Sequence, residues 1–114
     1  MNDILAGLNE WGCDVKGALE RFINDESMYM SFLSEVSVEP SLVNLGDAID
    51  NGDVKGAFEY AHTLKGVYGN MGLTPMFAKD SEIVEILRVG GMDTVSEKYQ
   101  TLLQMNDKLK EIIG

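Results

Sequence analysis

The sequence predicts an all-α protein, folded as an antiparallel up-and-down four-helix bundle with short N-terminal helices. Apolar residues recur at helical spacing along most of the 114 residues, and no stretch shows the apolar–polar alternation of a strand. Only two prolines interrupt the chain, and the expected connections are a few residues long, which favours antiparallel helices. The length fits a single domain over 1–114, with the short helices in 1–24 and the bundle helices in 26–113.

Two short helices are expected in the N-terminal part, over 3–10 and 15–23. Gly12 ends the first helix, and Asp14 can cap the second because its carboxylate can accept from a free backbone N–H. The apolar residues that recur on one side of these helices are Ile4, Leu5, Leu8, Val15, Ala18, Leu19 and Phe22.

The next helices are expected over 26–37 and 40–51, and the second is either a separate helix or a continuation of the first. Asp25 can cap the helix over 26–37, and Pro40 occupies a position typical of the first residue of a helix. The residues expected to face the core are Met28, Phe32, Leu33, Val36, Leu42, Leu45 and Ile49.

Three longer helices are expected over 54–71, 75–89 and 94–113. The signals that bound them are Gly52 and Asp53 before the first, Thr74 as cap and Pro75 at the start of the second, and Gly90, Gly91 and the cap Asp93 before the third. The expected core residues of these helices are Ala57, Tyr60, Leu64, Val67, Met71, Ile83, Val84, Leu87, Val95, Tyr99, Leu102, Leu109 and Ile113.

The charge of the chain argues against two classes of partner. Its net charge is −10, from 19 acidic and 9 basic residues. Proteins bind nucleic acids and anionic membranes through clustered lysine and arginine side chains, so neither is an expected partner of this chain.

The chain offers little for metal binding, disulfides or export. One cysteine, Cys13, and one histidine, His62, cannot form a disulfide framework or a four-ligand zinc site. The start MNDILAGLNEWG lacks the basic residues and apolar run of a signal peptide, and no window reaches the ~20 apolar residues of a membrane span. We therefore expect a cytoplasmic protein, and nothing in the sequence demands more than a monomer.

His62 is expected on the outer face of its helix. With about 100° per residue, the residues within about 60° of His62 are charged, aromatic or lack a side chain, whereas the opposite side is apolar. Those near His62 are Lys55, Phe58, Glu59, Lys65, Gly66 and Gly69. The two glycines leave the backbone beside the imidazole without side chains, so another macromolecule can approach closely. A glycine inside a helix destabilises it by ~1 kcal/mol relative to alanine.

From these residues alone, two interpretations of His62 stay open. An exposed neutral imidazole beside an ammonium suits attack on a phosphoryl group, with Lys65 neutralising the product, because phosphoryl transfer depends mainly on positioning and charge. Alternatively, His62 is a solvated surface residue, and the glycines belong to ordinary capping near the helix end.

The segment AHTLKGVYGNMG, residues 61–72, resembles the signature of histidine-containing phosphotransfer (HPt) domains of bacterial two-component phosphorelays. The segment over 12–36 is similar to the short helix and long helix that begin these domains. The signature residues met here are Ala61, His62, Leu64, Lys65, Gly66 and Gly72, and Asn70 is also common in the family.

The resemblance implies a four-helix bundle in which His62 accepts the phosphoryl group and Lys65 neutralises its charge. It gives Gly66 the role of clearance for the partner and Gly72 that of supporting the turn out of the helix. Such domains relay phosphate between aspartates of receiver domains, with a hybrid sensor kinase upstream and a response regulator downstream. The Mg²⁺ belongs to the receiver, so no cofactor is expected in this chain, which would be a stoichiometric carrier and not an enzyme.

One departure from the family concerns the orientation of the imidazole. Several members place a glutamine where this chain has Val84, and that glutamine hydrogen-bonds the histidine. Asp80, Ser81, Glu59 or a water could take its place. Phe58, one turn before His62, is either a docking anchor for a receiver, together with the clearance at Gly66 and Gly69, or is covered by a neighbouring element.

Other functions fit the sequence less well. No G-x-x-x-x-G-K-[ST] motif for ATP is present, and the acidic stretch over 47–59 lacks oxygen ligands at two EF-hand positions, Ile49 and Phe58. A Cys13–His62 nucleophile pair is disfavoured because Cys13 belongs to a distant helix connection. The remaining alternative is a helical adapter that binds a receiver or kinase without accepting phosphate.

Overall fold

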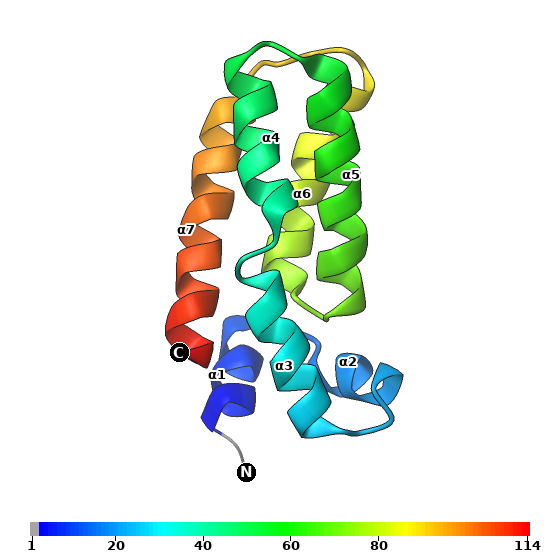
Figure 1. The fold of residues 1–114 in the computed structure, drawn as a ribbon, viewed down its shortest axis with the longest axis vertical. Coiled ribbons are helices and arrows are strands. Elements are labelled where there is room, and N and C mark those ends of the chain that lie inside the picture. The colour runs from blue at the N-terminus through cyan, green and yellow to red at the C-terminus, as the bar shows by residue number, and fades with distance from the viewer. Residues whose placement is uncertain (1–2) are drawn as a thin grey trace.

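The computed structural model describes residues 3–114, and this part of the chain is all-helical, with 79% helix and no strands. The first two residues of the expected segment 1–24 lie outside the described residues. Figure 1 shows α4 to α7 side by side in an elongated molecule, with α1, α2 and α3 gathered towards one end. The helices are α1 (Asp3–Trp11), α2 (Val15–Arg21), α3 (Glu26–Val36), α4 (Pro40–Asp50), α5 (Val54–Asn70), α6 (Thr74–Arg88) and α7 (Val95–Ile113).

The predicted caps of α2 and α3 are confirmed. The Asp14 carboxylate accepts from the backbone N–H of Gly17, and the Asp25 carboxylate accepts from that of Met28, each at 3.0 Å. Each carboxylate thereby satisfies a backbone N–H that has no partner within its own helix. The two caps fix where α2 and α3 begin.

The inward face of α3 differs from the prediction. Met28 and Phe32 are 47% and 43% exposed, so their assignment to the core is wrong, whereas Tyr29 is fully buried. The side of α3 that meets the rest of the molecule follows Tyr29, Leu33 and Val36, at i, i+4 and i+7. Phe32 instead lies beside Phe22 of the α2–α3 connection, with ring centroids 5.3 Å apart.

The helices α3 and α4 are separate, which answers the question that the sequence left open. Glu39, directly before Pro40, is extended with φ −62° and ψ 122°, because a residue that precedes proline is disfavoured in the α region. Its carboxylate accepts from the N–H of Ser41 at 2.7 Å and caps α4. The helical path is therefore broken between Val36 and Pro40.

The core is formed where α4, α5, α6 and α7 pack on one another in the order α4–α5–α6–α7, with α7 also against α4. In Figure 1 the α4–α5 and α6–α7 turns lie at one end of these four helices, and the α5–α6 turn lies at their other end, next to the N-terminal helices. Fully buried residues from these helices are Leu45, Ala57, Ala61, Leu64, Tyr68, Met76, Ile83, Val84, Val95, Leu102 and Leu109.

Three further predictions about these helices are wrong. Thr74 does not cap α6: Leu73 stands at the cap position without a side-chain bond, because Thr74 already belongs to the helix. Asp93 does not cap α7, since the cap position falls on Thr94, whose φ is 65°. Tyr60 is 36% exposed, because the buried face of α5 is centred on Ala61 and its neighbours along the helix and leaves Tyr60 at its edge.

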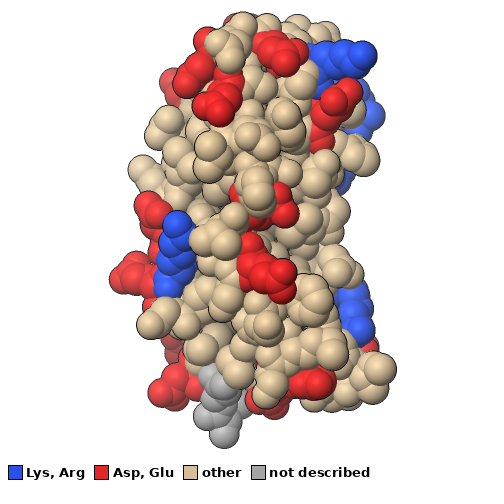
Figure 2. Space-filling model, viewed as in Figure 1, with Lys and Arg blue, Asp and Glu red and all other residues tan. Residues whose placement is uncertain are grey.

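The acidic excess of the sequence is visible on the face of the molecule shown in Figure 2. Figure 2 shows aspartate and glutamate side chains spread over the visible face, with uncharged surface between them. Among residues 3–114, no helix is both long enough and apolar enough to cross a membrane.

Candidate functional site

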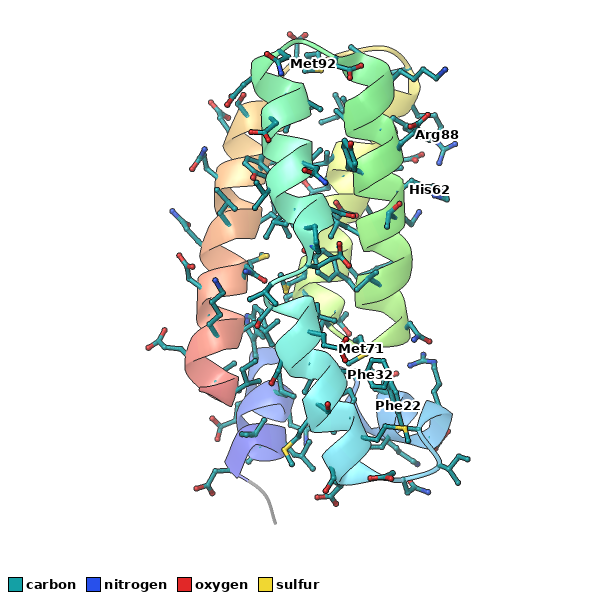
Figure 3. The ribbon with its side chains drawn as sticks, in the orientation of Figure 1. Phe22, Phe32, His62, Met71, Arg88 and Met92 are labelled. Atoms are coloured by element: carbon teal, nitrogen blue, oxygen red, sulfur yellow. The ribbon has the colours of Figure 1, made fainter. Side chains whose placement is uncertain are left out.

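His62 lies near the middle of α5 and is exposed, as predicted. The residues that anchor this part of the helix, Ala61 and Leu64, are fully buried, so the backbone beneath the imidazole is held by the core. Figure 3 shows the side chain of His62 pointing outward from α5. The imidazole makes no hydrogen bond to any residue that the structure describes. Its ring nitrogens are therefore open to a partner molecule.

A short stack of side chains borders the imidazole on one side. The half-buried Phe58 ring lies one turn before His62, with ring centroids 5.8 Å apart and planes tilted by 30°. The guanidinium of Arg88, from α6, lies 5.3 Å from the centroid of the same ring. Arg88 is held in turn by Glu85, whose carboxylate accepts from Nε at 2.9 Å. Phe58 is thus partly covered by α6, and Arg88 is a neighbour that the sequence analysis missed.

Lys65 borders the site on the other side. It is half-buried, and its ammonium lies 5.8 Å from the ring centroid of Phe77 on α6. In the described part of the chain Lys65 forms no ion pair, although acidic residues outnumber basic ones about two to one. Its charge is therefore available to an anion that arrives next to His62.

The two glycines beyond His62 differ in their surroundings. At Gly66 an added Cβ would meet nothing within 4 Å, so this position opens onto solvent. At Gly69 a Cβ would lie 3.1 Å from the Phe77 ring, so the missing side chain lets α5 and α6 approach. Only Gly66 leaves bare backbone on the outside of the molecule beside the imidazole.

The end of α5 is tied to the N-terminal helices through its backbone. Gly72 has φ +69°, a conformation that favours glycine, and a Cβ there would overlap the Asp14 carbonyl. The carbonyl of Gly72 accepts from Asp14 N–H at 2.8 Å, and that of Asn70 accepts from Arg21 at 2.9 Å. The carbonyl of the intervening Met71 accepts from the Tyr29 hydroxyl at 2.8 Å.

The position that carries glutamine in several family members is closed here. Val84 is fully buried, and neither Asp80, Ser81 nor Glu59 bonds the imidazole. Asp80 is itself fully buried, and its two oxygens find no hydrogen-bond partner among residues 3–114. Burial raises the pKa of Asp80 to about 8, and the charge of Lys65 offsets part of this rise.

The burial of Asp80 could have been predicted from the sequence. It follows Met76 by four residues and precedes Ile83 and Leu87 at the spacing of the α6 core residues. A carboxylate in such a series is unusual, because burial of an unpaired charge is costly. Periodicity alone, however, does not reveal that the charge of Lys65 acts on this carboxyl group.

A shallow groove lies on the same helix, towards its C-terminal end. It measures about 230 Å³, and its apolar walls come from Phe32 and Val36 of α3 and from Val67 and Met71. Figure 3 places Phe22 and Phe32 together beside Met71, well below His62. Among the described residues, no group of three histidine, cysteine or acidic side chains is placed to hold a metal ion.

Comparison with known proteins gives one match. A family model described as Hpt domain matches residues 28–112, from within α3 to within α7, and so includes the whole of α5 with His62. No curated protein and no solved structure shows significant similarity to the chain.

Proposed function

Because this chain belongs to the Hpt domain family, whose members carry phosphoryl groups in two-component signalling, we propose that it is a phosphohistidine carrier. It relays a phosphoryl group between the aspartates of receiver domains, as a stoichiometric intermediate. Hpt domains are phosphotransfer carriers rather than catalytic kinases, and they interact with receiver domains and histidine kinases. The partners proposed here are a hybrid sensor kinase upstream and a response regulator downstream, in the cytoplasm.

The proposal treats residues 1–114 as one HPt unit that works as a monomer. In it, α4 to α7 form an antiparallel up-and-down four-helix bundle, and α1 to α3 close one end. The turns at alternate ends of these four helices and the packing of each helix on the next support this arrangement. The packed helices hold α5 in place, and the side chain of His62 projects outward from it.

His62 is the proposed phosphoacceptor. The lone pair of a neutral ring nitrogen attacks the phosphorus of an aspartyl phosphate on the receiver. The N–P bond forms as the P–O bond to the aspartate breaks, and the receiver carboxylate leaves with the electron pair. The exposure of His62 and the lack of hydrogen bonds to it within the described chain are the observations that carry this assignment.

Lys65 is proposed to neutralise the phosphoryl group on His62. It lies one turn further along α5 and forms no ion pair in the described chain, so its ammonium can pair with an incoming anion. The Mg²⁺ that assists transfer is assigned to the receiver domain, and this chain is assigned no cofactor. Electrostatic stabilisation of this kind is the main contribution a protein makes to phosphoryl transfer.

The receiver is proposed to dock on the face around His62. Gly66 gives the close approach, since nothing within 4 Å occupies the space of its missing side chain. Phe58 offers the exposed part of its ring as an apolar contact, and Gly69 lies at the margin of the same face. The partner can then bring its aspartyl phosphate in line with the imidazole nitrogen.

A labelling experiment tests this function. The protein is incubated with a receiver domain that carries radiolabelled phosphate, and the label is checked for the acid lability and alkali stability of an N–P bond. We expect label on the wild type and none on His62→Gln, with circular dichroism showing the same helix content for both. Binding of the receiver without any transfer of label would contradict the proposal and identify the protein as an adapter.

A further inference from the structure

A buried carboxyl group lies behind the Lys65 side of the site. Asp80 projects from α6 and is fully buried, and both of its oxygens lack a hydrogen-bond partner among the described residues. The Tyr68 hydroxyl, from α5, is also buried without a partner in that part of the chain. Polar groups left in this state cost about 1–3 kcal/mol each, so the cluster is not explained by stability.

The charges around Asp80 single out one residue. From α5, Lys65 acts on Asp80 as a cation, and Asp80 in turn acts on Tyr68. Glu39, at the start of α4, and Tyr99, from α7, also act on Tyr68. The three groups that act on Tyr68, namely Asp80, Glu39 and Tyr99, supply no positive charge. Lys65 is therefore the cation to which Asp80 responds, and it is also the cation nearest to His62 along α5.

The position of Lys65 allows it to serve either group. Its ammonium lies over Phe77, one turn before Asp80 on α6, and forms no ion pair in the described chain. A lysine side chain has four rotatable bonds and can redirect its ammonium without backbone movement. It can therefore turn outward to a phosphoryl group on His62 or inward to the Asp80 carboxyl.

We propose that Asp80 is a positioning residue that determines, by its protonation, whether the Lys65 ammonium is free to meet the phosphoryl group on His62. This inference rests on the proposed function. When Asp80 is neutral, it exerts no pull on the ammonium, and Lys65 turns towards the phosphoryl group. When Asp80 gives up its proton to solvent, the resulting carboxylate draws Lys65 inward, and the phosphoryl group loses its counter-charge.

The expected consequence is a loss of transfer on the alkaline side. Burial raises the pKa of Asp80 to about 8, so the acid is mostly neutral at pH 7 and mostly ionised at pH 9. A carrier with this arrangement works best near neutral pH and slows as the pH passes the pKa of Asp80. A charge-neutral residue of the same size at position 80 should remove that decline.

The first experiment compares initial rates of phosphoryl transfer from a phosphorylated receiver to the wild type and to Asp80→Asn, at pH 6.5 to 9.5. The ratio of the two rates at each pH cancels the titration of the receiver and of His62, which both proteins share. We expect the ratio of Asp80→Asn to wild type to rise several-fold between pH 7 and pH 9. A ratio that stays constant across this range would overturn the inference.

A second measurement needs no phosphoryl group and no substitution at position 80. The Asp80 carboxyl carbon is followed by ¹³C NMR during a pH titration of the wild type, Lys65→Gln and the control Lys55→Gln, which removes a lysine near the start of α5. We expect the pKa of Asp80 to rise in Lys65→Gln and to stay at its wild-type value in Lys55→Gln. An unchanged pKa in Lys65→Gln would show that the two groups do not interact.

The two experiments also separate this inference from the proposed function. If the wild type accepts no label at any pH, the phosphocarrier assignment fails, whatever the NMR titration gives. If label reaches His62 but the rate ratio is flat, the assignment stands and the role of Asp80 is lost.

Discussion

The Phe58 ring lies against the imidazole of His62, with centroids 5.8 Å apart, and the guanidinium of Arg88 from α6 lies 5.3 Å from the centroid of the same ring. In the described chain no hydrogen bond orients the imidazole, so this ring contact is what restricts it. Aromatic pairs at such distances contribute about 0.5–1.5 kcal/mol. Phe58 therefore has a structural task in addition to any contact with a partner.

Replacement of Phe58 by alanine should slow phosphoryl transfer by several-fold, because the imidazole loses the neighbour that limits its rotation. We also expect a loss of about 1–2 kcal/mol in the free energy of unfolding, less than for a fully buried phenylalanine. Labelling rates and urea denaturation measure the two effects. Phe58→Leu is the matched control: it keeps the apolar contact with α6, so it should recover most of the stability while transfer stays slow.

Substitutions at Gly66 should separate stability from docking. A Cβ at this position meets nothing within 4 Å, so Gly66→Ala should raise the free energy of unfolding by up to about 1 kcal/mol through helix propensity. Gly66→Arg should gain similar stability but block the receiver sterically, with transfer reduced at least tenfold. Normal transfer by a well-folded Gly66→Arg protein would remove the argument for close approach at this glycine.

The Tyr29 hydroxyl should contribute to stability through one buried hydrogen bond. It donates to the Met71 carbonyl at 2.8 Å, and Tyr29 is fully buried. Tyr29→Phe should therefore lower the free energy of unfolding by about 1–2 kcal/mol, because the carbonyl keeps no equivalent partner. Tyr60→Phe, at a site that is 36% exposed, should change it little. Equal effects of the two substitutions in thermal unfolding would contradict this account.

The stability of the protein should fall as the pH rises towards 8. Folded Asp80 keeps its proton up to a pH of about 8, whereas an unfolded aspartate loses it near pH ~4. Between these values the folded state binds one more proton than the unfolded state, so each rise in pH favours unfolding. Across the whole window the loss amounts to at most about 5 kcal/mol.

Asp80→Asn should remove this pH dependence, because an amide has no proton to lose. Urea denaturation at pH 5, 7 and 9 measures it. Near pH 5 the two proteins should differ by a small amount, and at pH 9 the variant should be clearly more stable. Parallel decline of both proteins with pH would mean that Asp80 is ionised in the folded state throughout.

Much of the fold could be predicted from local signals. The helix starts at Asp14, Asp25 and Pro40 depend on side chains within a few residues, and the structure confirms all three. The exposed position of His62 follows from helical periodicity alone. These features need no knowledge of what the rest of the chain does.

The caps predicted at Thr74 and Asp93 are each displaced by one residue, whereas the other errors concern features that depend on packing between distant segments. Tyr29, and not Met28, faces inward, and its hydroxyl donates to the carbonyl of Met71, which lies 42 residues away in the chain. The contact of Arg88 with Phe58 and the interaction of Asp80 with Lys65 also join two different helices. No local pattern specifies such pairs, so these contacts could not be predicted from the sequence.

The hydrogen bonds to the carbonyls of Asn70, Met71 and Gly72, at the end of α5, have a consequence for local unfolding. These carbonyls accept hydrogen bonds from Asp14, Arg21 and Tyr29, and Asp14 and Arg21 lie outside the segment that matches the Hpt family. The N-terminal part of the chain thus stabilises the C-terminal end of the histidine-bearing helix through these three hydrogen bonds. If these hydrogen bonds break, the final turn of α5 should fray and exchange its amide protons with solvent quickly, while the amides around His62 stay protected.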